Sequence, residues 1–169
     1  MAVFASRLVA FHDGLTRFGF ALAQLCLLAI VFSYCYETVA RYFFNAPTWW
    51  SNEIVAYALC IGTFLSLPEV TRRGGHISIT FLTDLLPPGP RSWVTRALSI
   101  LAGGVCLWVG WILLDMNLTQ FVREEMLVRV KPIPKVWISV WITYGFLSAG
   151  LHFLRHAASA RDTPGQVVL

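Results

Sequence analysis

Charged residues are scarce in this sequence. Aspartate, glutamate, lysine and arginine together make up only 13% of the 169 residues, whereas soluble globular domains carry roughly 25%. Hydrophobic residues reach 57%, aromatic residues 14%, and the mean hydropathy is +0.64. A chain with so little polar surface cannot cover a globule that faces water. The composition therefore indicates a membrane protein and excludes disordered, collagen-like and disulfide-scaffold classes.

Several chemical motifs are absent as well. The four cysteines lie inside apolar runs and form no Cys-x-x-Cys pair, which argues against a membrane thiol oxidase. The sequence has no Gly-rich phosphate loop, no Gly-x-Ser-x-Gly elbow and no tight metal-binding motif. The net charge of +4 is spread in short clusters, so a nucleic-acid partner is not expected. We expect a protein that is not an enzyme and binds no cofactor or metal.

Four apolar stretches are long enough to suggest membrane spans, since a bilayer core about 30 Å thick needs roughly 20 apolar residues in a helix. They are Phe18 to Tyr36, Ile54 to Pro68, Ala97 to Leu114 and Val136 to Leu151. The sequence predicts an all-α integral membrane protein with transmembrane helices at about 18–38, 50–69, 94–115 and 134–155. We expect one four-helix domain over residues 1–157 and a disordered tail over 158–169.

Two amphipathic helices are expected beside these spans. Apolar residues recur with helical spacing at Phe4, Leu8, Phe11, Leu15 and Phe18. This pattern predicts an N-terminal helix that lies in the headgroup plane and leads into the first span. A second interfacial helix is expected over 77–85 and is ended by two prolines.

The distribution of basic residues predicts the orientation. Eight of the 13 lysines and arginines fall at the membrane side that holds both termini, and five fall at the other side. Because lysine and arginine accumulate on the cytoplasmic side, we expect both termini in the cytoplasm.

Ionisable residues are missing from the middle of every predicted span. Glu37, Arg41, Glu53, Glu69 and Asp115 all lie close to span ends. A chain that moved ions by itself is expected to place a carboxylate near the bilayer centre. This absence argues against an autonomous small transporter.

Charged and aromatic residues gather where the first span meets the second. Glu37, Arg41 and Glu53 are expected to form a charged cluster, beside Trp49 and Trp50 in an aromatic belt. Two interpretations stay open: an interfacial salt bridge that anchors the hairpin, or a contact with a partner protein.

Small residues repeat at helix-packing distance, for example Ala58, Gly62 and Ser66, then Ser99 and Gly103. Gly145 and Ala149 continue the pattern in the last span. They pack the bundle internally in one interpretation and receive another protein's helix in the other.

The four histidines raise the possibility of a haem site, because membrane anchors of respiratory enzymes hold haem between histidines on two helices. His12 and His76 fall in interfacial segments, while His152 and His156 share one face at a helix end. We do not expect them to face one another inside the bundle. A membrane-anchor subunit of a respiratory redox enzyme remains the alternative function.

An ordered set of short motifs carries a family resemblance. The motifs are Arg41-Tyr42, Pro47-Thr48-Trp49-Trp50-Ser51-Asn52-Glu53, Gly62-Thr63-Phe64, Arg72-Arg73-Gly74-Gly75-His76-Ile77 and Leu85-Leu86-Pro87. Together they resemble the small membrane subunit of tripartite ATP-independent periplasmic (TRAP) transporters, the DctQ-type family. Pro134, Lys135 and Trp137, at the start of the last span, also agree with that family.

The resemblance implies a subunit without a substrate site of its own, in a bacterial inner membrane. A periplasmic binding protein (DctP-type) would capture an organic anion, and a large membrane subunit (DctM-type) would carry it inward with sodium. The small subunit would act as a scaffold for the large subunit and as a docking surface for the binding protein.

The same resemblance implies roles for matched residues, which would contact partners or lipids. Those expected at the periplasmic end are Arg41, Tyr42, Trp49, Trp50 and Glu53. Arg73 and His76 are expected to hold the cytoplasmic amphipathic helix against lipid or the large subunit.

Overall fold

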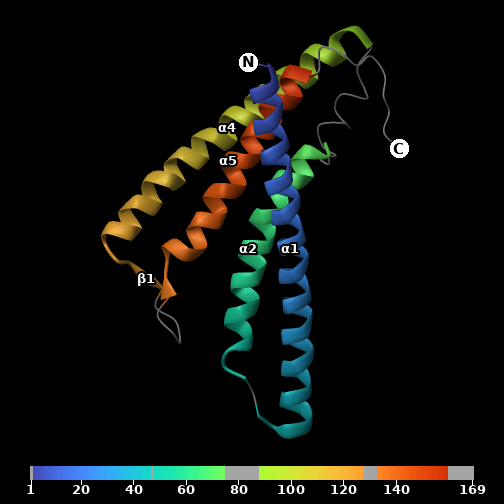
Figure 1. Ribbon diagram of the computed structural model, residues 1–169. Helices are drawn as coiled ribbons and strands as arrows, with labels where there is room; N and C mark the ends of the chain where they lie inside the picture. The colour runs from blue at the N-terminus through green and yellow to red at the C-terminus, as the bar shows by residue number, and fades with distance from the viewer. Residues whose placement is uncertain (1, 47, 75–87, 128–132, 160–169) are drawn as a thin grey trace.

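The computed structural model describes residues 2–46, 48–74, 88–127 and 133–159, and these residues are almost entirely helical (Figure 1). The helices are α1 (Ala2–Phe44), α2 (Ser51–Arg72), α4 (Pro88–Val122) and α5 (Val136–Ser159). Two short strands, β1 (Met126–Leu127) and β2 (Ile133–Pro134), pair antiparallel between α4 and α5. All four helices are long and apolar enough to cross a membrane, which confirms the predicted all-α membrane fold.

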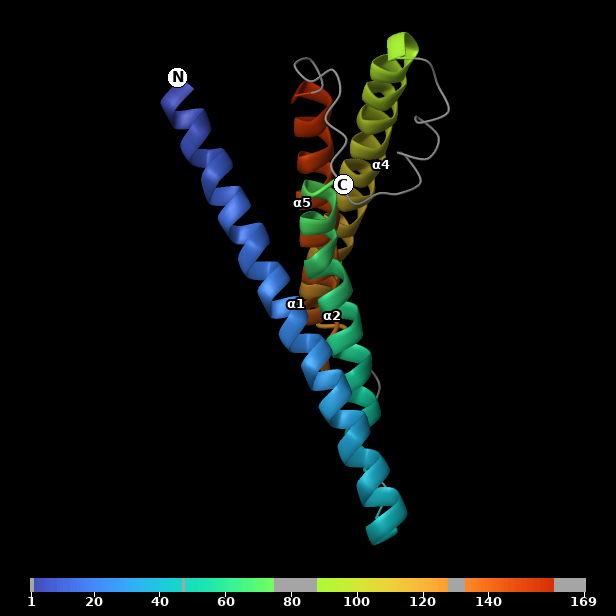
Figure 2. The same ribbon diagram turned by 90° about the vertical axis from the view of Figure 1, so that its right-hand side faces the viewer.

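The first helix is longer than the predicted span. The N-terminal amphipathic helix leads into the first span, as predicted, and the two form one continuous helix of 43 residues. Its sequence contains no proline, and its glycines, Gly14 and Gly19, each cost a helix only about 1 kcal/mol. At 1.5 Å per residue α1 is about 65 Å long, roughly twice the bilayer core. Figure 2 shows its N-terminal end diverging from α2 and α5.

The other helices cover the predicted spans and extend beyond most of their ends. The last helix runs through Ala158 and Ser159, two residues into the segment expected to be a disordered tail. The predicted interfacial helix over 77–85 and the rest of the tail lie outside the described residues.

The four helices pack as an open row. The extensive contacts join α1 to α2, α2 to α5, and α5 to α4. Among the described helices, no comparable contact joins α1 to α4 across the row. Large apolar side chains are therefore exposed along the row, such as Phe32 on α1 and Trp108 on α4. Such exposure is stable in lipid, because hydrocarbon is as apolar as the side chains themselves.

Glycines allow close approach within this row. A Cβ added at Gly145 on α5 would lie 2.5 Å from the carbonyl oxygen of Phe64 on α2. One added at Gly62 on α2 would lie 3.1 Å from the Cβ of Cys26 on α1. A Cβ at Gly103 on α4 would come within 3.3 Å of the Gly150 carbonyl oxygen on α5. These small residues therefore pack the helices of this chain against one another.

Replacing Gly145 by alanine is expected to destabilise the bundle, because the new methyl group meets backbone that can move only if α2 shifts from α5. Overpacking of this kind costs about 1–3 kcal/mol. The matched control is Gly104→Ala on α4, where an added Cβ has no neighbour within 4 Å among the described residues. Thermal unfolding in detergent, followed by size-exclusion chromatography, should show a clear decrease in Tm for Gly145→Ala only. Equal melting of the two variants would contradict the packing account.

Candidate functional site

Polar side chains concentrate at the two ends of the helix row. We call the end where α1 leads into α2 the hairpin end, and the end where α1 begins and α2 and α5 finish the terminal end. Each end is described in turn, because the sequence predicts contact residues at both.

An ion pair lies at the hairpin end. Arg41 Nη2 donates to Glu37 Oε1 at 2.5 Å, one helical turn apart on α1. The Glu37 side chain is buried while that of Arg41 is 57% exposed, so water around the guanidinium weakens the pair. Glu53, the third predicted member of this cluster, lies half-buried in the first turn of α2.

Aromatic residues line a hollow beside that pair. The Trp50 ring lies 5.5 Å from the Tyr36 ring, which brings the α1–α2 connection against α1. The hollow measures about 480 Å³ and is lined by Tyr36, Ala40, Phe44, Ala46, Thr48, Trp49 and Trp50. Predicted contact residues Trp49 and Trp50 are thus brought together here, whereas Tyr42 is 80% exposed and outside the hollow.

A buried carboxylate organises the end of α2. Glu69 is only 1% exposed and accepts hydrogen bonds from Arg72 at 2.6 and 2.7 Å and from Arg73 Nε at 2.8 Å. The Arg73 guanidinium also lies 5.3 Å from the centre of the Phe20 ring on α1, within the range of a cation–π contact. Arg73 therefore links α2 to α1, while its predicted companion His76 lies outside the described residues.

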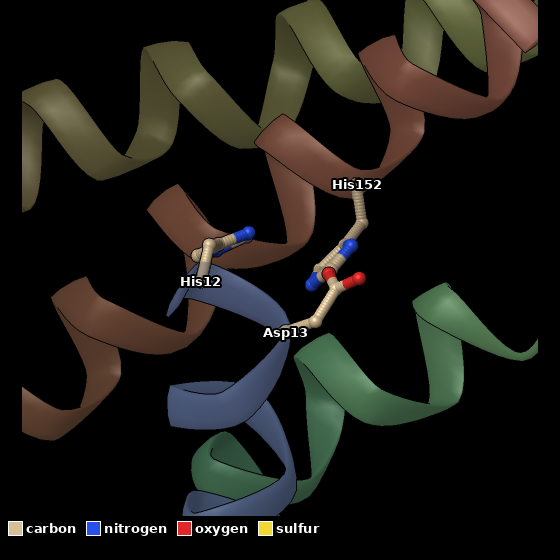
Figure 3. A group of neighbouring side chains, drawn as sticks. All are labelled: His12, Asp13 and His152. Atoms are coloured by element: carbon tan, nitrogen blue, oxygen red, sulfur yellow. The ribbon is translucent and has the colours of Figure 1, made fainter. Parts of the chain in front are cut away.

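A second polar group joins α1 directly to α5 (Figure 3). We call it the polar cluster, and it consists of His12, Asp13, Thr16, Ser148, His152 and Arg155. His12 Nε2 lies 2.9 Å from Ser148 Oγ, and His152 Nε2 lies 3.1 Å from Thr16 Oγ1. The two imidazole rings stack with their centres 4.4 Å apart.

An ion pair completes the polar cluster. Arg155 donates from Nη1 to Asp13 Oδ1 at 2.5 Å and from Nη2 to Oδ2 at 3.3 Å. One turn further along α5, a hydrogen-bond contact joins α5 to α2: His156 Nε2 lies 3.0 Å from the carbonyl oxygen of Thr71. These contacts fasten the N-terminal part of α1 and the C-terminal ends of α2 and α5 to one another.

The expectation that the histidines do not face one another is wrong. His12 and His152 meet because α1 continues as a straight helix past α2 and reaches α5. The sequence pattern that could have indicated this contact is a set of polar residues on one face of each helix: His12, Asp13 and Thr16, then Ser148, His152 and Arg155. Nothing in the sequence pairs the two faces. Stacked rings also cannot serve as axial ligands on opposite sides of one haem iron.

The fold and its two polar ends define a multi-pass α-helical membrane protein whose described polar contacts bind its own helices together. Comparison with known families makes this class specific. The family of "Tripartite ATP-independent periplasmic transporters, DctQ component" matches residues 30–163, so the chain belongs to that family. This confirms the resemblance found in the motifs and places the chain among transporter components rather than enzymes.

A curated relative agrees with this assignment. The chain is 22% identical over 118 residues to the "Ectoine TRAP transporter small permease protein TeaB" of Halomonas elongata. The match covers 70% of this chain and 61% of the relative, so it spans about three fifths of the relative's length.

Glu69→Gln is expected to destabilise the terminal end, because the neutral amide keeps the volume but leaves Arg72 without its buried counter-charge. Hydrogen bonds to charged groups contribute about 1.5–3 kcal/mol, and partial exposure of Arg72 favours the lower part of that range. The control is Glu125→Gln, which removes a more exposed pair with Lys135. Thermal unfolding in detergent should show a Tm decrease several times larger for Glu69→Gln than for the control. A smaller decrease than in the control would refute the role given to Glu69.

Proposed function

We propose that the chain is the small scaffold subunit of a TRAP transporter in a bacterial inner membrane. A DctM-type large membrane subunit would carry an organic anion inward, coupled to sodium, after a DctP-type periplasmic protein has captured it. The family match over residues 30–163 supports the subunit assignment. Sodium coupling and the substrate class come from the family resemblance, and both belong to the partners rather than to this chain.

The open row of helices is the observation that carries the scaffold role. A row α1–α2–α5–α4 leaves both broad faces available to lipid and to a partner's helices. Its buried ionisable groups lie at the ends and bind other residues of this chain, as Glu69 binds Arg72 and Arg73. A rigid, apolar row is suited to hold a large membrane subunit in place while another part of that subunit moves.

The hairpin end supports a docking role. Tyr42 and Arg41 are exposed there, beside the hollow lined by Trp49 and Trp50. Thr48 Oγ1, in the lining of this hollow, is buried without a hydrogen-bond partner among the described residues. Because buried polar atoms rarely stay unpaired, a partner that binds at this surface would satisfy it. We assign this surface to the periplasmic binding protein.

Charge supports the proposed orientation. Arg72, Arg73 and Arg155 gather at the terminal end, where the positive-inside tendency places the cytoplasm. Their guanidinium groups are also suited to contact anionic lipid headgroups, since Arg73 is mostly exposed.

Purification in mild detergent tests the proposal against the redox-anchor alternative. We expect the chain, tagged at Leu169 and taken from its native membrane, to bring with it a colourless many-span partner in a fixed ratio. The visible spectrum is recorded on the same sample, because haem absorbs strongly there. A coloured complex with soluble redox subunits would refute the transporter assignment, and a chain that purifies alone would refute the scaffold role.

A further inference from the structure

Three potential metal ligands converge inside the polar cluster. His12, Asp13 and His152 each offer one ligand atom, and these atoms all lie within 4.8 Å of one another (Figure 3). Two of the residues come from α1 and one from α5, so the group exists only in the folded chain. We propose that these three side chains form a binding site for a divalent transition metal ion of the Zn²⁺ type. Two imidazoles and one carboxylate are a ligand set that such ions accept, with a fourth position left for water.

Hydrogen bonds prepare the imidazole of His152 as a ligand. The Thr16 hydroxyl donates its hydrogen to the His12 carbonyl oxygen at 2.9 Å. Its oxygen therefore accepts from His152 Nε2–H at 3.1 Å. This bond selects the neutral tautomer in which Nδ1 of His152 carries a lone pair. A hydrogen bond at the second ring nitrogen is the usual support of a metal-binding histidine.

His12 has a comparable arrangement. Its Nε2 is paired with Ser148 Oγ at 2.9 Å, so both imidazoles of the site hydrogen-bond through Nε2 to a hydroxyl group. The 2% exposure of His152 keeps its ring in place, while half-buried Asp13 opens the site toward the surface. The ligands are thus held by the fold, and an ion can still reach them.

Arg155 sets the affinity of this site. Its guanidinium holds Asp13, but a carboxylate has about four lone-pair positions and can bind an arginine and a metal ion together. The arginine charge nevertheless repels a divalent ion placed a few ångströms away. Since the Arg155 side chain is 39% exposed, it can also turn into water when an ion binds. Replacement of Arg155 is therefore expected to strengthen metal binding. If the cluster were purely structural, loss of the ion pair between Arg155 and Asp13 would only weaken it.

Bound metal would join the first helix to the last. It would add a strong link between α1 and α5, which already share the hydrogen bonds and the ion pair of the polar cluster. By mass action an ion that binds only the folded chain raises the free energy of unfolding. This consequence is independent of the proposed transport function and can be measured on the isolated chain.

Co²⁺ titration of the purified chain tests the site, with an affinity tag that contains no histidine. We expect visible d–d absorption that saturates at one Co²⁺ per chain and disappears when Zn²⁺ is added. His12→Gln and His152→Gln should each weaken binding by about tenfold or more, as expected for loss of a ligand. The matched control is His156→Gln, because that imidazole contacts the backbone of α2 and is not among the three ligands. It should bind Co²⁺ like the wild-type chain.

Two further measurements keep the outcome decisive. Arg155→Gln should bind Co²⁺ about tenfold more tightly, equivalent to about 1.4 kcal/mol. Zn²⁺ should raise the Tm of the wild-type chain but not that of His12→Gln. The same melting curves, recorded without metal, show whether a variant folds poorly. Absence of Co²⁺ absorption in the wild-type chain would overturn the proposal. Unchanged affinity in His12→Gln, or weaker binding in Arg155→Gln, would overturn it as well.

Discussion

Polar groups inside a membrane have no water to bind, so each one needs a partner from the protein. That constraint decides how these helices are arranged. Thr16 of α1 pairs with His152 of α5, and His156 of α5 lies 3.0 Å from the Thr71 carbonyl oxygen of α2. Asn117 of α4 donates to Thr143 of α5 at 2.7 Å. Apolar side chains pack about equally well against lipid or any helix, whereas these bonds are specific for one neighbour.

The open row follows from the same constraint and gives the protein its proposed role. Polar bonds and glycine contacts hold α1, α2, α5 and α4 in sequence along one layer. The remaining surface is apolar, which suits both lipid and the helices of a larger subunit. At the hairpin end the exposed aromatics and the unpaired Thr48 hydroxyl provide a different kind of surface, suited to a protein outside the bilayer.

The helices and the family could be predicted from the sequence, because long apolar runs and ordered motifs are local signals. The full length of α1 was not predicted, although amphipathic and fully apolar segments both favour a helix when no residue breaks it. The pairing of His12 with His152 depends on which helices are neighbours, and a single sequence does not encode that visibly. The partner contacts of Tyr42, Trp49 and Glu53 stay predictions, because they require the other subunits.

Transport by reconstituted subunits tests the central claim most directly. Proteoliposomes would contain this chain, the large membrane subunit, or both, each with the periplasmic binding protein loaded with the ligand that it captures. The scaffold account predicts uptake only when both membrane subunits are present. Uptake by this chain alone, or full uptake by the large subunit without it, would contradict the account.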